Sequence, residues 1–111
     1  MTTIPKIKSG DIVVRTAPYE FEVREYTVDG EVKKCLYTGV KDEKNTRVFT
    51  GDILTKPNFL PKLAYVVELG QRGFDAIPVR FDGEKWVIGI PTTLESPLST
   101  GFIVTGNIYE L

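Results

Sequence analysis

The stretch YTGVKDEKNTRVFTGDI, residues 37–53, places two apolar segments around a charged reversal and ends by starting a third apolar segment. Residues 41–45 supply the charges of the reversal, and residues 47–49 resume a pattern typical of extended chain. The dipeptide Asn45-Thr46 is a weaker turn former than Asn-Gly, so the sequence predicts a loose loop at the reversal. We expect the rest of the chain to pack around this stretch.

A second hairpin is predicted immediately upstream. Asp29-Gly30 stands between β-forming residues, and an Asp-Gly pair in that setting is the strongest short-range hairpin signal. The returning strand should cover residues 31–38 and should end or kink at Gly39, because glycine weakens a strand interior.

The segment before that hairpin carries two further strand signals. Residues 12–14 form a short β-branched run after a turn signal, which is typical of a strand. From residue 19 onwards apolar and charged residues alternate, but the alternation changes parity near Arg24-Glu25. A β-bulge at that point would restore the register, so we expect one there.

Downstream of the central stretch, residues 62–68 (KLAYVVE) fit either a helix or a strand, and the pair Val66-Val67 favours a strand. Residues 73–81 indicate another strand. Pro78 lies within it and cannot donate a backbone hydrogen bond, so the strand should lie at a sheet edge or contain a bulge.

The C-terminal part of the chain predicts a hairpin, a long loop and a last strand. Asp82-Gly83 should turn the chain into a strand over residues 85–90. Residues 91–100 (PTTLESPLST) are rich in Ser, Thr and Pro and lack periodicity, so they should form a loop. Residues 101–109 supply the final strand.

These signals together indicate an all-β protein. About eight short antiparallel strands with turn signals at near-regular spacing predict a small barrel or sandwich. The 111 residues fit a single domain, residues 1–111. One short helix near residues 60–69 is the main alternative within that fold class.

Composition excludes several kinds of chemistry. Histidine is absent, which removes the commonest general base, the commonest metal ligand and the Ser/His and Cys/His nucleophile pairs. We therefore expect no enzymatic activity and no cofactor. Formal net charge is −1, so no overall positive field would attract nucleic acid or an anionic membrane.

The single cysteine and the hydropathy pattern bear on location. Cys35 cannot form an internal disulfide, which suits a reducing compartment, and its neighbours indicate a packing residue more than a reactive thiol. No apolar run approaches the length of a signal peptide or a membrane span. We expect a cytoplasmic protein with no membrane partner.

Several acidic residues in predicted turns are possible catalytic or metal-binding groups. Asp11 and Asp52 each follow a glycine, and capping of nearby backbone amides explains them better than a pair of catalytic carboxylates. Asp42 and its charged neighbours lack the further oxygen ligands of a calcium or magnesium site, so a solvated turn is expected there.

Apolar residues in proline-rich loops indicate a protein interface. The loop at residues 56–61 carries Phe59 and Leu60, and the loop at residues 91–100 carries Leu94 and Leu98. Trp86 is either the largest core residue or an interface anchor, since tryptophan is common in both settings.

A small-ligand, nucleotide or single-stranded nucleic-acid site is the alternative. Basic and aromatic residues interleave around the central hairpins, as in small β-barrels that stack bases along a cationic groove. The residues concerned are Lys33, Lys34, Lys41, Lys44, Tyr26, Tyr37 and Phe49. In this alternative Arg47, Arg72 and Arg80 would contact phosphate.

Three blocks of the sequence resemble the signature of the YopX family of phage and prophage proteins. They are YTGVKD at residues 37–42, VFTGDI at residues 48–53 and VTGNIYE at residues 104–110. The resemblance implies a mostly β domain encoded by a phage or prophage, with a tendency to oligomerise, in the cytoplasm of a bacterial host. It implies no particular activity.

From the residues and the resemblance together we expect a small accessory protein that acts as a non-enzymatic interaction module. Its partners would be a second copy of itself and a host or phage protein, with contacts through edge strands or the proline-bracketed loops.

Overall fold

The computed structural model describes residues 5–8, 10–12, 23–57, 63–71 and 73–110. In chain order the elements are β1 (Val23–Val28), β2 (Glu31–Lys41), β3 (Arg47–Phe49), β4 (Asp52–Thr55), β5 (Leu63–Leu69), β6 (Phe74–Phe81), β7 (Trp86–Ile88), β8 (Thr92–Thr93), α1 (Glu95–Ser99) and β9 (Ile103–Asn107).

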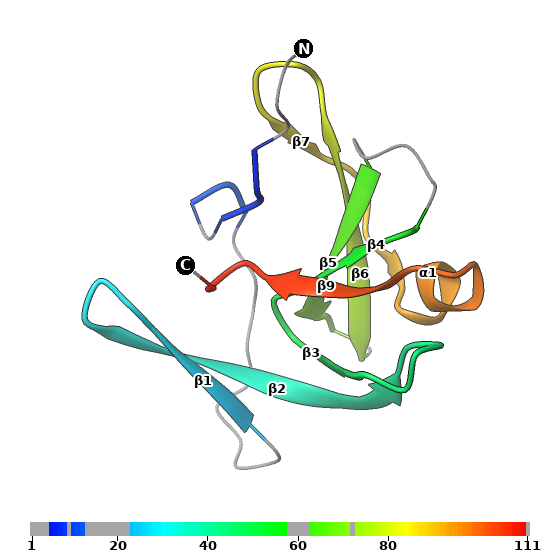
Figure 1. Ribbon diagram of the computed structural model, residues 1–111, viewed down its shortest axis with the longest axis horizontal. Coiled ribbons are helices and arrows are strands. Elements are labelled where there is room, and N and C mark those ends of the chain that lie inside the picture. The colour runs from blue at the N-terminus through cyan, green and yellow to red at the C-terminus, as the bar shows by residue number, and fades with distance from the viewer. Residues whose placement is uncertain (1–4, 9, 13–22, 58–62, 72, 111) are drawn as a thin grey trace.

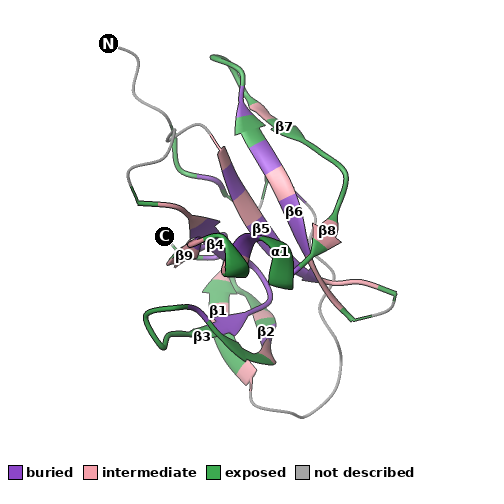
Figure 2. Ribbon diagram, turned by 90° about the vertical axis from the view of Figure 1, so that its right-hand side faces the viewer, coloured by how far each residue is buried: buried purple, intermediate pink, exposed green. Residues whose placement is uncertain are grey.

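The protein is all-β, as the sequence predicts, and its strands form two antiparallel sheets. One sheet has the order β1-β2-β3, and the other has the order β7-β6-β5-β4-β9, with β8 paired to β6. The three-stranded sheet lies below the six-stranded one in both Figure 1 and Figure 2. Within the described residues neither sheet closes on itself, so the arrangement is an open two-sheet fold and not a barrel.

The hairpin at Asp29-Gly30 is confirmed. Both residues have positive φ, 52° and 78°, which is the backbone that a two-residue type I′ turn requires. The pairing of β1 with β2 runs without interruption from Val28↔Glu31 to Val23↔Leu36.

That unbroken register shows that the expected bulge near Arg24-Glu25 was wrong. Arg24 and Tyr26 share one face of β1, and although Arg24 is exposed, its guanidinium carbon lies 4.2 Å from the centre of the Phe49 ring. A cation over an aromatic ring is favourable, so this exposed arginine covers the buried Phe49 ring. The strands expected at residues 12–14 and from residue 19 fall largely outside the described residues.

Gly39 kinks β2, as expected, but does not end it. Its φ is 86°, and the register between β2 and β3 shifts between Tyr37 and Lys41. β2 therefore continues to Lys41, beyond the boundary that the sequence predicted.

The predicted strand over the KLAYVVE segment is confirmed, and the short helix considered near residues 60–69 is wrong for Leu63–Leu69. β5 lies between β4 and β6, and Val66 and Val67 are both fully buried because both faces of the sheet are covered. Residues 60–62 lie outside the described part of the chain.

The helix is found instead at α1, in the segment that was expected to be a loop. Residues 91–100 contain both α1 and the two-residue strand β8. A single helical turn is too short to produce a periodic pattern, which explains why the sequence did not reveal it.

Pro78 lies in an interior strand, contrary to the expected edge or bulge, since β6 pairs with β5 on one side and with β7 and β8 on the other. The Gly89 amide donates to the Pro78 carbonyl at 2.7 Å. The Pro78 nitrogen faces the same side, where pairing changes from β7 to β8, so the missing donor falls at a break in the ladder.

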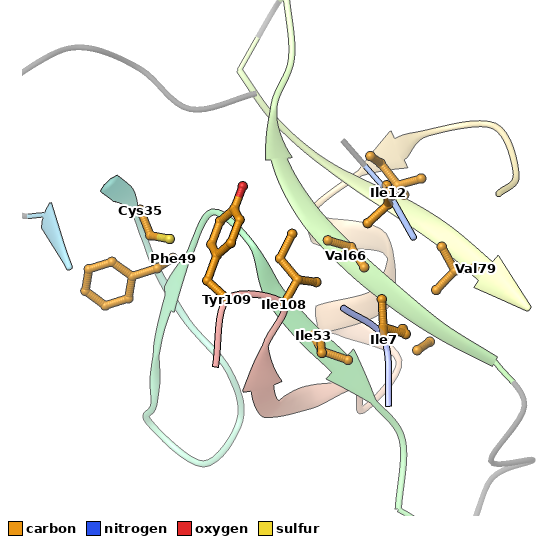
Figure 3. Packing of buried hydrophobic residues seen from close by; sticks show 11 residues of the cluster. Ile7, Ile12, Cys35, Phe49, Ile53, Val66, Val79, Ile108 and Tyr109 are labelled. Carbon is orange, nitrogen blue, oxygen red and sulfur yellow. The ribbon is translucent and has the colours of Figure 1, made fainter. Parts of the chain in front are cut away.

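The two sheets share a hydrophobic core. Tyr109 lies between Cys35 and Phe49 from the smaller sheet and Ile108 from the C-terminal segment (Figure 3). A second cluster lies beside α1 and contains Val48, Leu54, Val67, Ala76, Leu94 and Phe102. The central stretch contributes to both clusters, which explains why the rest of the chain is arranged around it.

Candidate functional site

A buried polar network joins the two sheets where β4 pairs with β9. Asn107 Nδ2 donates to Asp52 Oδ1 at 2.9 Å and to the Thr50 carbonyl at 3.3 Å, while Asn107 Oδ1 accepts from the Tyr109 amide at 2.9 Å. The Phe49 amide donates to Asp52 Oδ2 at 2.7 Å. Asn107, Thr50 and Asp52 are all fully buried.

Burial governs the titration of this network. It raises the pKa of Asp52 to about 6, although the bonds from Phe49 and Asn107 act in the opposite direction. Burial also raises the pKa of the neighbouring Cys35 thiol to about 11. Enclosed groups of this kind hold the sheets together and have no access to a substrate.

Asp52 therefore caps a backbone amide, as the sequence predicted. Asp11 does the same, since its Oδ2 accepts from the Lys8 amide at 2.8 Å on the exposed side of a turn. The two carboxylates serve separate turns.

Asp42 corrects the expectation of a solvated turn. The residue is only 6% exposed, and its Oδ1 accepts from the Lys44 and Thr46 amides at 2.9 Å each. Its Oδ2 accepts from the Val104 amide in β9 at 2.9 Å, across 62 residues. The local bonds are a pattern that sequence can suggest, but the bond to β9 depends on the tertiary fold.

An apolar groove of about 610 Å³ lies between α1 and the end of β2. Val40, Phe74, Leu94 and Leu98 contribute apolar surface to it, and Lys41 and Glu95 contribute opposite charges. The volume falls within the range of about 300–1,000 Å³ that is usual for ligand sites.

Two of the sequence-predicted interface residues meet at this groove. Leu94, the N-cap residue of α1, is buried, Leu98 within α1 is half-buried, and both line the groove. Trp86 lies elsewhere, with its ring centre 5.5 Å from that of Phe81, and its buried Nε1 has no hydrogen-bond partner among the described residues. Phe59 and Leu60 lie outside the described residues.

Of the arginines in the alternative reading, Arg47 and Arg80 do not line the groove. Arg47 belongs to β3 in the smaller sheet, where its guanidinium carbon lies 5.5 Å from the centre of the Tyr37 ring. Arg80 belongs to β6 in the larger sheet and is exposed. Arg72 lies outside the described residues.

The aromatic residues of that reading are engaged in packing. Phe49 is buried beneath Arg24, and the Tyr37 ring lies 5.4 Å from it. The Tyr26 and Tyr109 rings are 6.4 Å apart at the join between the sheets. These rings do not form an open row on which bases could stack.

Sequence reasoning missed an exposed apolar edge at β7. Val87, Ile88 and Ile90 are three of the five large hydrophobic residues that are exposed in the described part of the chain. The signal was present in the uncharged run WVIGIPTTL, residues 86–94, but only the strand order places this run at an edge.

The described residues contain no group of three or more His, Cys, Asp or Glu side chains placed to hold a metal ion. They also contain no helix of the length and apolar character needed to cross a membrane.

Comparison with known proteins finds no matching family model, no matching curated protein and no matching solved structure.

Proposed function

We propose that this chain is a YopX-like accessory protein of a phage or prophage that acts in the cytoplasm of the bacterial host as a non-enzymatic, self-associating interaction module. The apolar groove beside α1 carries this proposal. It would bind a short segment of a host or phage protein that presents apolar side chains to Val40, Phe74 and Leu98.

The groove also suggests the charge pattern of that segment. Lys41 and Glu95 both line the groove, one on β2 and the other on α1. A segment with an acidic residue near Lys41 and a basic residue near Glu95 would be oriented by them, since complementary charges at a rim select orientation more than they add affinity.

Two observations are in keeping with the remaining parts of the proposal. Asp52 and Cys35, which have raised pKa values, are fully buried, so neither is available as a catalytic group. The blocks that resemble the YopX signature are neighbours, because β4 and β9 pair through Asp52↔Asn107 (Figure 1). Sequence blocks that identify a family are expected to pack together when they stabilise its common fold.

Affinity capture from a bacterial lysate with matched variants tests the groove. Leu98→Glu places a charge in the groove, whereas Ser96→Glu adds the same charge to an exposed residue of α1 outside the groove lining. We expect a protein that is captured by the wild type and by Ser96→Glu and is lost with Leu98→Glu. Equal capture by all three would reject the groove as the partner site.

A small ligand in the same groove is the second candidate, because the volume suits one. A rise in Tm on addition of a nucleotide or another small molecule, abolished by Leu98→Glu, would favour it. Salt-dependent binding of single strands would favour the nucleic-acid form of this alternative.

A further inference from the structure

We infer that β7 is the self-association surface, and that two copies of the chain pair antiparallel through it with Ile88 opposite Ile88 of the second copy. This inference rests on the self-association included in the proposed function and supplies the surface and the register.

The backbone of β7 is open on one side. β7 pairs with β6 through Arg80↔Val87 and Phe81↔Trp86, and in the described residues it has no strand on its other side. Hydrogen-bonded pairs alternate along an antiparallel ladder, and the Gly89 amide donates to the Pro78 carbonyl. Trp86 and Ile88 therefore direct their amides and carbonyls away from β6, where a further strand can pair.

The side chains along this edge are apolar and exposed. Ile88 is 49% exposed, Ile90 88% and Val87 37%. Figure 2 shows β7 and the segment after it mostly in green at the margin of the larger sheet. Consecutive exposed hydrophobic residues on an edge strand are the arrangement that monomeric β proteins avoid.

The opposite edge of the same sheet is protected. The Asp42 carboxylate accepts from the Val104 amide of β9, which removes a donor that an incoming strand would need. Native proteins block edges with devices of this kind, and among the described residues none is found at β7, so the two edges of the larger sheet differ.

The uncharged edge at β7 favours a second copy of the chain as its partner. A two-fold contact requires a self-complementary surface, because each residue meets the same patch on the partner. Residues 86–94 carry no charge, so two antiparallel copies bring no like charges into contact. When Ile88 is at the two-fold axis, Lys85 of one copy lies opposite the uncharged Pro91 of the other copy, so the lysines do not face each other.

The residues whose amides and carbonyls point away from β6 set the register between the two copies. With Ile88 on the axis, Trp86 lies opposite Ile90, and the most exposed isoleucine is covered. With Val87 on the axis, Ile90 would face Glu84 instead. The first register pairs apolar with apolar side chains and is the one we propose.

Size-exclusion chromatography with light scattering at micromolar concentration tests the surface. We expect a dimer for the wild type and a monomer for Ile88→Lys, which would place two lysines opposite each other at the axis. Val32→Lys changes an exposed valine on the other sheet and should remain dimeric. A monomeric wild type, or a dimeric Ile88→Lys, overturns the inference.

Cysteine crosslinking tests the register without depending on the folding of the lysine variant. Cα atoms of a hydrogen-bonded antiparallel pair lie about 5.5 Å apart, which suits a disulfide. Ile88→Cys should therefore crosslink on oxidation, whereas Val87→Cys should not, because it lies opposite Gly89. Preferential crosslinking of Val87→Cys, or none by either variant, overturns the proposed register.

Partner capture separates this inference from the proposed function. Suppose that the wild type is monomeric and captures a partner that only the Leu98→Glu variant fails to capture. The β7 contact is then rejected, and partner binding at the groove stands. If the dimer forms through Ile88 but capture is insensitive to Leu98→Glu, the groove fails and the β7 contact remains.

Discussion

Asn107 Nδ2 lies 2.9 Å from Asp52 Oδ1, although 55 residues separate them in the chain. The bond joins β4 to β9 in the larger sheet, and both side chains are fully buried. Because Asn107 also bonds the Thr50 carbonyl and the Tyr109 amide, one side chain satisfies three buried polar groups, two near the turn between β3 and β4 and one in the C-terminal segment.

Replacing Asn107 with alanine should destabilise the protein by at least about 1–3 kcal/mol, the cost of leaving one buried polar group without a partner. Asp52 would keep only the Phe49 amide, and the Tyr109 amide would lose its acceptor. Urea denaturation measures the change. Thr105→Ala, on the exposed side of β9, is the control and should change stability by less than about 1 kcal/mol.

The raised pKa of Asp52 predicts a pH-dependent stability. The carboxyl group of Asp52 binds its proton more tightly in the folded state than in the unfolded state. The contribution of Asp52 to stability is therefore present at low pH and is lost as pH rises through about 6. Relative to Asp52→Asn, the wild type should gain about 2 kcal/mol on going from about pH 7.5 to about pH 4. Chemical denaturation of both proteins across this range checks the sign, and a constant difference would contradict it.

Cys35 should be unreactive in the folded protein. Its side chain is fully buried, and burial raises the pKa of its thiol to about 11, so neither access nor thiolate is available near neutral pH. A thiol-specific chromophoric reagent should label it only as fast as the protein opens, and should label it at once in denaturant. Rapid labelling without denaturant would show that the join between the sheets opens readily.

Alanine substitutions at Gly51 and Gly30 test the close packing of Gly51 against Asn107, with Gly30 as the control. Both have positive φ, 84° and 78°, so alanine at either position carries a backbone penalty of about 1–2 kcal/mol. A Cβ at Gly51 would also lie 3.1 Å from Asn107 Nδ2, whereas at Gly30 it would meet no described residue within 4 Å. Thermal unfolding should therefore show a larger loss for Gly51→Ala than for Gly30→Ala, and equal losses would contradict the crowding at Asn107.

Local structure could be predicted from the residues of each segment. Asp29-Gly30 and Asp82-Gly83 predicted their hairpins, because the turn geometry depends on the residues within the turn. Capping by Asp52 and the strand at β5 were also predicted, and the all-β class followed from these local signals. Leu94 and Leu98 were identified as apolar residues in a proline-rich segment, which is again a local property.

Which of these local features meet depends on the fold of the whole chain. The groove exists because α1 places Leu94 and Leu98 against the end of β2, and a single helical turn leaves no periodic signal. The burial of Asp42 depends on a bond to a residue 62 positions away, and the exposure of Ile88 and Ile90 depends on strand order. Pairing between distant segments is set by packing of the whole chain, so residue patterns predict the strands but not their neighbours.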